Sequence, residues 1–322
     1  MTGAGSFVFA IGSDGSATRL AMTASTADAP GAVLLWRHID GSDADALAWL
    51  AEHGGLPDTV LAALQAAETR PRAAKIGDGA LVILRGVNQK PDADPDDLVS
   101  IRLWVSAGEI LSVRFRPLLA VGDMEDVVRS GAVRDAGDFI VELADVLTRR
   151  LDDTLEGLSQ SLDTIDEDVL DGSSEAVRER IGAIRRTAIG LRRFIAPQRD
   201  ALAQLASGPF GFLDTDDRLY VAEAASSVTR IIEEIDSIRE QAAVLSDQLA
   251  DVRAEAVGKR TLVLSIVSAV FLPLTFMTGL VGMNVAGIPF ASQSWAFGAI
   301  AAGNLGIAVL IIAWLRWRGW FD

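Results

Sequence analysis

Small and hydroxyl-bearing residues recur along one side of a predicted helix near the carboxyl terminus. At about 100° of rotation per residue, six positions fall within an arc of roughly 80°: Thr261, Ser265, Ser268, Leu272, Thr275 and Gly279. Hydroxyl oxygens give a hydrated ion weak, exchangeable contacts, and a leucine among them can form a hydrophobic constriction. The spacing therefore predicts the lining of an ion pathway, although close packing of neighbouring helices explains the small residues equally well.

The sequence around this stripe has the length and purity of a membrane-spanning segment. Residues 261–315 contain no Asp, Glu, Lys, Arg or His, and a helix of about 20 apolar residues crosses the roughly 30 Å hydrocarbon layer. Two glycine-containing stretches, Gly282-Met283-Asn284 and Gly287-Ile288-Pro289, interrupt it. We expect a first transmembrane helix over residues 261–281, an outer loop over 282–294 and a second transmembrane helix over 295–315.

Pro273 lies in the middle of the first predicted span. Because proline has no backbone N–H, it bends or widens a helix and frees a carbonyl of the preceding turn. Freed carbonyls can line a pore, and membrane helices also tolerate proline for structural reasons alone. The sequence leaves both roles open.

Charged residues flank the two spans on the same side. Lys259 and Arg260 precede the first span, and Arg316 and Arg318 follow the second. Positive charge stays on the cytoplasmic side of a membrane, so both termini, including a tail over residues 316–322, are predicted to be cytoplasmic. Tryptophans mark the ends of the second span, where an amphipathic ring is favoured: Trp295, Trp314, Trp317 and Trp320.

The net charge of −15 belongs almost entirely to residues 1–260. Such an acidic, water-soluble region repels phosphates and concentrates cations, so nucleic acid is not an expected partner. The absence of cysteine excludes disulfides and thiolate metal sites and suits a reducing cytoplasm. Residues 1–15 lack the features of a cleaved signal, so the spans themselves must direct insertion.

Residues 1–135 are predicted to form a small cytoplasmic α/β domain. Val, Ile, Leu and Trp enrich four strand-like runs, and helical periodicity marks two further segments. The strands are expected at residues 32–39, 80–87, 98–106 and 110–114, and the helices at 43–53 and 57–68. His38 and His53, the two histidines of the chain, are predicted at surface or helix-cap positions.

Residues 136–260 are predicted to form a stalk of long helices, because Gly and Pro become rare and apolar residues recur every three or four positions. Two helices are expected at about 138–170 and 174–207. A third begins near Asp214 and continues into the membrane, giving a rod of roughly 65 residues and about 100 Å. Its apolar stripe needs neighbours, which favours a bundle of symmetric copies.

The first two long helices carry opposite charges. The first is rich in carboxylates and the second in arginines. An antiparallel pair joined by surface ion pairs accounts for this pattern, with about 0 to 1 kcal/mol for each pair. Alternatively, the acidic helix gathers or senses cations near the inner mouth of a pore.

The membrane segment resembles a known family. Residues 271–280, Phe-Leu-Pro-Leu-Thr-Phe-Met-Thr-Gly-Leu, followed by Gly282-Met283-Asn284, are similar to the first span and signature loop of the two-transmembrane GxN family of CorA- and ZntB-like divalent-cation transporters. The continuation over residues 285–289, and residues 84–88 and 97–104 upstream, look more like the zinc-transporter branch. The resemblance thus covers nearly the whole chain.

The resemblance implies an α+β membrane protein that assembles as a funnel-shaped homopentamer. The α/β domain and the stalk would be cytoplasmic, the first span would line the pore and the second would form an outer ring. The selectivity filter would be Gly282, Met283 and Asn284, with a ring of Asn284 amides. Neutral carboxamide oxygens can bind the water shell of a dication without removing it, so Asn284 would be an outer-sphere metal contact.

The sequence departs from the magnesium-type pattern. Val281 and Val285 flank the signature where aromatics are usual, and residues 285–294 have no carboxylate. Zinc prefers Cys, His and carboxylate ligands, and the spans have none, so zinc is expected to pass largely hydrated. The resemblance also suggests coupling to protons, which must then use pore water or cytosolic carboxylates.

The leading hypothesis is a Zn²⁺ transporter of the cell inner membrane, with no cofactor and with lipid, divalent cations and protons as its partners. One alternative is a CorA-type Mg²⁺, Co²⁺ or Ni²⁺ channel, and another is a membrane-anchored cation sensor or scaffold. No nucleophile, base and orienting group and no Gly-x-x-x-x-Gly-Lys-Ser/Thr phosphate loop emerge, so an enzyme or ATP-driven pump is not predicted.

Overall fold

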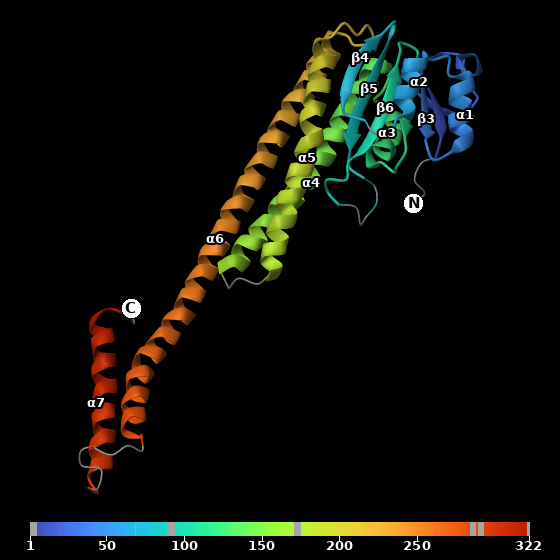
Figure 1. Ribbon diagram of the computed structural model, residues 1–322. Helices are drawn as coiled ribbons and strands as arrows, with labels where there is room; N and C mark the ends of the chain where they lie inside the picture. Colours follow the sequence, from blue (N-terminus) through green and yellow to red (C-terminus); the bar gives the residue numbers. More distant parts are fainter. Residues whose placement is uncertain are drawn as a thin grey trace. The chain divides into compact units, whose positions relative to one another are not determined.

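The computed structural model describes residues 5–67, 69–88, 90, 94–170, 175–283, 288 and 293–320 (Figure 1). By their internal contacts the residues form two compact units, Met1–Ser246 and Asp247–Asp322. Each unit is described by itself below. The finer predicted division, with borders after residues 135 and 260, remains a prediction.

The first unit contains a seven-stranded sheet in the order β2-β1-β3-β7-β6-β5-β4. Neighbouring strands are antiparallel, with the exception of β3 and β7, which run parallel and pair Trp36 with Ile110. The strands are β1 (Phe7–Gly12), β2 (Ala17–Leu20), β3 (Ala32–Asp40), β4 (Arg72–Ile76), β5 (Gly79–Gly86), β6 (Val99–Val105) and β7 (Glu109–Arg114).

The four predicted strands are confirmed as β3, β5, β6 and β7, with borders that agree to within one residue. The sequence analysis missed β1, β2 and β4. The last two are short strands at the sheet edges, with sequences Ala-Thr-Arg-Leu and Arg-Ala-Ala-Lys-Ile. Ala, Arg and Lys have little strand preference, so pairing with a neighbour rather than local sequence forms these strands.

Helices α1 (Ala44–His53) and α2 (Asp58–Gln65) pack on one face of the sheet, where Leu50 and Val60 join a buried cluster with Ile83 and Val113. Asp43 caps α1 by accepting hydrogen bonds from the backbone N–H groups of Asp45 and Ala46, as its position before the helix predicts. Helix α2 ends three residues before the predicted border at Glu68.

Helix α3 (Leu119–Ser130) was not predicted. Its N-cap residue, Leu118, provides no side-chain cap, so the usual start signal is missing. Its end is marked by Gly131, whose φ of 85° lies in the left-handed region that glycine adopts easily. The short 3-10 helix η1 (Thr26–Asp28) precedes β3.

The prediction of a surface position for His38 is wrong. The side chain is fully buried on β3, with Nδ1 2.8 Å from the Ser112 hydroxyl, and its ring stacks on Phe7 with centroids 5.0 Å apart. Strand β3 is covered on both faces, so the alternation that exposes every second residue of an edge strand does not apply. Burial lowers the pKa of His38 to about 3, with the Arg114 charge as a smaller cause. His53 is exposed in the last turn of α1, as predicted.

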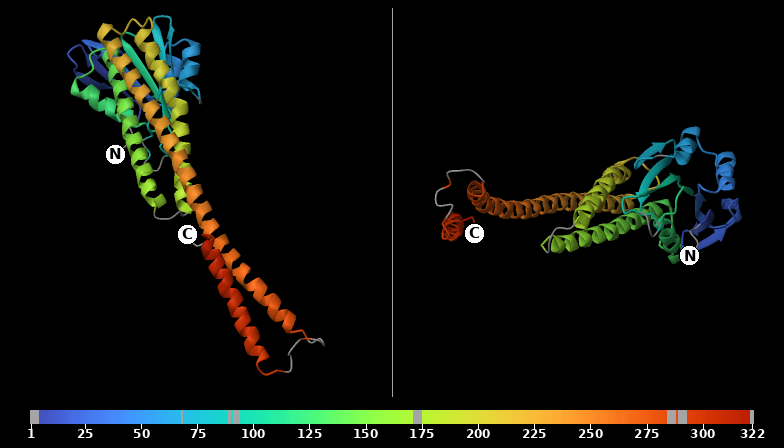
Figure 2. Two further views of the ribbon diagram at one scale, coloured as in Figure 1. Left: turned by 90° about the vertical axis from the view of Figure 1, so that its left-hand side faces the viewer. Right: turned by 60° about the horizontal axis from the view of Figure 1, so that its bottom comes forward.

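The three long helices are confirmed as α4 (Ala136–Leu170), α5 (Glu175–Ser207) and α6 (Thr215–Val281). In the first unit α4 and α5 lie side by side, and both contact the sheet (Figure 2). Asp135 accepts hydrogen bonds from the N–H groups of Gly137 and Asp138 at the start of α4. The predicted turn at Asp171-Gly172 lies outside the described residues.

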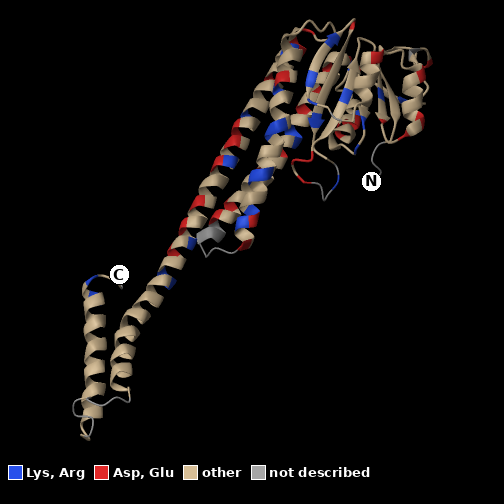
Figure 3. Ribbon diagram, viewed as in Figure 1, with Lys and Arg blue, Asp and Glu red and all other residues tan. Residues whose placement is uncertain are grey.

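The charged faces of α4 and α5 also bind other helices (Figure 3). Arg150 of α4 forms a two-bond ion pair with Asp123 of α3, at 2.6 and 2.8 Å. Arg192 of α5 donates to Asp236 of α6 at 2.8 Å. Part of the positive charge of α5 is therefore balanced by a carboxylate of α6.

The second unit consists of the end of α6 and α7 (Ala296–Trp317). Both helices are long and apolar enough to cross a membrane. Figure 3 shows the end of α6 and α7 as almost uninterrupted tan, with charged residues only at their outer limits. The two predicted spans thus coincide with the last part of α6 and with α7.

Candidate functional site

The six residues predicted to line a pathway lie on α6, and all six are exposed. Leu272 is the most prominent, with 75% of its surface accessible. Neither α7 nor any other described element of this chain covers this face. The face is therefore available for water, for lipid or for another copy of the chain.

Helix α7 runs alongside the end of α6 (Figures 1 and 2). The partly covered residues of α6 in this segment are Leu262, Ile266, Val270, Pro273, Leu274 and Val281. At 100° per residue this stripe is centred about 160° from the hydroxyl stripe. The apolar side of α6 thus packs on α7, and the hydroxyl side points away from it.

The serine hydroxyls on the hydroxyl face are oriented by the helix that carries them. Ser265 Oγ donates to the carbonyl of Thr261 and Ser268 Oγ to the carbonyl of Leu264, each at 2.9 Å. Because the hydroxyl hydrogens point back to the backbone, the oxygen lone pairs face outward. Outward lone pairs suit a cation or the hydrogens of its water shell.

Gly282 ends α6 on the loop side. Its N–H donates to the carbonyl of Thr278 at 2.9 Å, and a Cβ at this position would lie 3.0 Å from that same oxygen. A glycine therefore fits this close turn better than a larger residue. Met283 follows and is 47% exposed. Asn284, the predicted selectivity residue, lies outside the described residues.

Acidic side chains precede the membrane segment on α6. Asp247, Asp251 and Glu255 are spaced by four residues and are exposed, so they follow one side of the helix. Glu255 accepts a hydrogen bond from Lys259 at 2.7 Å, which lowers the pKa of its carboxyl group. The sequence analysis placed cation-gathering carboxylates on α4 and overlooked this series, whose four-residue spacing was the available signal.

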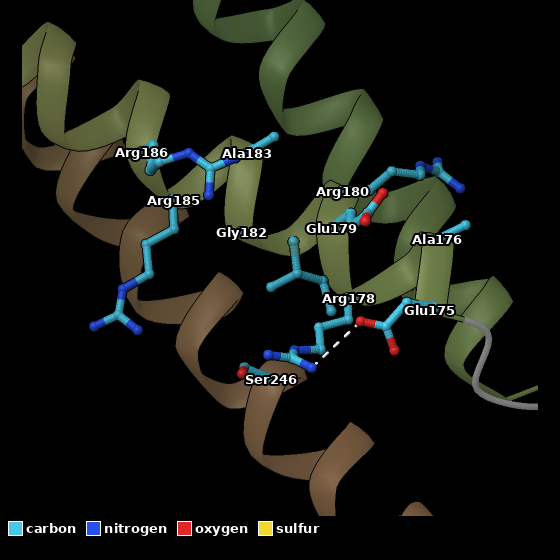
Figure 4. Close-up of a pocket in the computed structure, with 11 residues that line it drawn as sticks. Glu175, Ala176, Arg178, Glu179, Arg180, Gly182, Ala183, Arg185, Arg186 and Ser246 are labelled. Atoms are coloured by element: carbon cyan, nitrogen blue, oxygen red, sulfur yellow. Dashed lines mark hydrogen bonds and ion pairs between the residues drawn. The ribbon is translucent and has the colours of Figure 1, made fainter.

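No preformed metal site accompanies these carboxylates: within the described ranges, no three His, Asp or Glu side chains come close enough together to hold an ion. A cavity of about 860 Å³ lies at the start of α5. Figure 4 shows Arg178 reaching toward Ser246 and pairing with Glu175 at 3.3 Å, with Arg185 and Arg186 nearby. A cavity lined by several guanidinium groups repels dications and is no part of a cation pathway.

An acidic soluble unit, a helix that continues into a hydroxyl-faced apolar segment, and a second apolar helix define a membrane transporter of the two-span type. The chain belongs to the family of CorA-like Mg²⁺ transporter proteins, whose sequence profile matches residues 31–317.

Individual relatives cover most of the chain. The zinc transport protein ZntB of Yersinia enterocolitica is 34% identical over 286 residues, which are 88% of this chain and 87% of the relative. The divalent cation transporter CmaX of Pseudomonas aeruginosa is 37% identical over 266 residues, 82% of this chain and 80% of the relative. The solved structure of a full-length CmaX protein matches with a TM-score of 0.82 and 31% identity, covering 100% of both chains.

Proposed function

We propose that this protein transports divalent metal cations, with Zn²⁺ as the principal ion, through a pore lined by α6. The observation that carries the proposal is the exposed hydroxyl stripe on the side of α6 away from α7. Membership of a transporter family and relatives named for zinc transport support it.

The pore requires several copies of the chain. One α6 presents the lining residues on one side only, and a single helix encloses nothing. A closed ring of identical subunits with α6 inside and α7 outside converts this exposed face into a channel. We propose a homopentamer, in line with the family resemblance, placed in the cytoplasmic membrane with both termini inside.

We further propose that Asn284 amides from all subunits form the selectivity ring, shaped by the tight turn at Gly282 and Met283. Such a ring would contact hydrated dications at the outer mouth. Below the ring, further hydroxyl oxygens would come from Thr275, Ser268, Ser265 and Thr261. The pore would be narrowest at the apolar side chain of Leu272 and widest at Gly279.

The hydration of the transported ion follows from the side chains that the spans lack. The spans carry no side chain that coordinates zinc directly, so zinc would move with its water. A second candidate is transport of Mg²⁺, Co²⁺ or Ni²⁺, of which the description of the family names Mg²⁺. The membrane potential favours entry of any dication by about 4.6 kcal/mol per 100 mV, so inward flux needs no cofactor and no enzymatic step.

Proton coupling, if it accompanies transport, has to use pore water or carboxylates on the cytosolic side of the spans. No Asp, Glu or His lies within residues 261–315, and proton relays in membranes usually use these residues. The carboxylates of Asp247, Asp251 and Glu255 are the proposed cytosolic proton acceptors, and pore water would carry the proton through the spans.

The proposal is tested with purified protein in liposomes, varying zinc, magnesium and the proton gradient independently. We expect Zn²⁺ influx that Asn284→Ala abolishes while the protein remains pentameric, and that Gln293→Ala, in the same loop, leaves unchanged. Unaltered flux in Asn284→Ala would refute the amide ring, and absence of flux in the wild type would favour a membrane-anchored sensor or scaffold.

A further inference from the structure

Asn304 is the one amide side chain between Ala296 and Leu315 of α7, where the other residues are apolar or glycine. Its Oδ1 atom is buried and has no hydrogen-bond partner among the residues that the structure describes. In hydrocarbon an unpaired amide is unfavourable, because no water can replace the missing partner. The position of Asn304 in the middle of a span therefore calls for a partner.

Helix α6 contains a complementary defect. Pro273 lies inside this continuous helix and has no N–H, so the carbonyl of Ala269, four residues earlier, loses its helical donor. The neighbouring hydroxyl of Ser268 does not replace it, because it donates to Leu264. A free acceptor thus remains on α6 at the depth of the bend.

The lengths of the two helices, counted outward from the loop that joins them, place the two defects at the same level. The partly covered or buried residues of α7 form a single stripe: Leu315, Ile311, Ala308, Ile307, Asn304, Ile300 and Ala296. This stripe runs antiparallel to the covered stripe of α6 (Figures 1 and 2). Counted outward from the loop, Asn304 falls opposite Pro273, since Pro273 is eight residues before Val281 and Asn304 eight after Ala296.

We propose that the Asn304 amide donates a hydrogen bond to the carbonyl of Ala269 and thereby holds the bend of α6 at Pro273. A half-turn about the Cβ–Cγ bond exchanges the unpaired oxygen for the NH₂ group and turns a donor toward the helix that has the free acceptor. One bond then satisfies polar groups of both helices within the hydrocarbon layer.

The inference rests on the proposed function, because the bend carries two of the proposed lining residues, Leu272 and Thr275. Asn304 is in that account a positioning residue. It touches no ion, and it acts by fixing where the constriction of α6 stands.

A double-mutant cycle tests the bond, because Pro273→Ala returns an N–H to the Ala269 carbonyl. With Pro273 present, Asn304→Leu should lower Zn²⁺ flux about three- to tenfold, the factor expected for one interhelical hydrogen bond in a membrane. In the Pro273→Ala protein the same substitution should change flux by less than about twofold. The control Ile307→Leu, on the same stripe of α7, should leave flux unchanged.

Equal losses in the two backgrounds, or no loss with Pro273 present, would overturn the inference. The thermal midpoints of the four proteins in detergent provide a second cycle that needs no transport. If the wild type carries no flux, the proposed function fails, while coupled midpoints still support the bond and additive midpoints refute it.

A third measurement is independent of the Pro273→Ala protein. The chain has no cysteine, so introduced pairs report proximity without background. Val270→Cys with Ala308→Cys should form a disulfide within one chain, whereas Phe271→Cys with Ala308→Cys, at the same depth but on an exposed side of α6, should not. A disulfide with Phe271→Cys and none with Val270→Cys would place Asn304 away from Pro273 and contradict the inference.

Discussion

The two units of this molecule handle apolar side chains in opposite ways. In Met1–Ser246 the large residues of the sheet lie inside, and Trp36 and Phe139 have no accessible surface. In Asp247–Asp322 large residues point outward, with Phe297 82% and Leu272 75% exposed. The first unit buries its apolar side chains within one chain. The apolar side chains of the second unit must instead be covered by lipid and by other copies of the chain.

Removing a large side chain from the soluble core should have the largest effect on stability. Trp36 packs edge-on against Phe7 and Phe139, and its Nε1–H donates to Ser112 at 2.9 Å. Trp36→Ala leaves a cavity and removes one hydrogen bond to Ser112, so we expect a loss of about 3 to 5 kcal/mol. Denaturant unfolding followed by circular dichroism measures it, and a loss below about 1 kcal/mol would show that this core is not closed.

The buried His38 should make the soluble unit sensitive to acid. Its pKa is lowered from 6.5 to about 3 by burial, so below pH 6.5 the unfolded chain binds a proton that the folded chain does not. Stability should therefore fall as the pH drops from 6.5 toward 3, by at most about 1.4 kcal/mol per pH unit. His38→Phe should flatten this fall, measured as the thermal midpoint against pH. An equally steep fall in the variant would show that other groups cause it.

The ion pair between α5 and α6 should matter much less. Arg192 and Asp236 are 2.8 Å apart, but their side chains remain 45% and 32% exposed. Arg192→Ala should therefore cost about 0 to 1 kcal/mol and the loss should shrink in salt. A salt-independent loss above about 2 kcal/mol would indicate that the pair is shielded from solvent in the assembled protein.

Leu272→Ala should have the smallest effect on stability and a clear effect on transport. The side chain is 75% exposed in a single chain, so the thermal midpoint should stay within about 1 °C of the wild type. A wider, less apolar constriction should raise Zn²⁺ flux. Unchanged flux together with a large drop in midpoint would mean that Leu272 fills a protein interface and does not line a pore.

Periodic sequence predicted the long elements of both units well. Residues 138–170, 174–207 and the rod from Asp214 repeat apolar residues every three or four positions, and the helices found there agree within about two residues. The charge-free segments likewise coincide with the apolar end of α6 and with α7. In these elements local pattern and tertiary environment demand the same residues.

The sequence-based predictions failed for elements whose structure depends on residues distant in the sequence. Edge strands β2 and β4 have weak strand preferences, and α3 starts without a capping side chain. His38 was misplaced because its burial depends on Phe7 of β1 and Ser112 of β7, which are far from it in the sequence. The spacing of the residues alone predicted the hydroxyl stripe. The sequence could not predict which face of α6 stays uncovered, because that depends on the position of α7. Asn284 lies outside the described residues.

Cysteine scanning of α6 tests the central claim most directly, because the chain has no cysteine of its own. Single cysteines are placed at Ser265, Ser268 and Thr275 on the hydroxyl stripe and at Leu262, Ile266 and Val270 on the α7-facing stripe. The account predicts that a charged, water-soluble thiol reagent reacts with the first three and blocks Zn²⁺ flux in liposomes, and that it spares the second three. Block from the α7-facing positions, with the hydroxyl stripe unreactive, would contradict it.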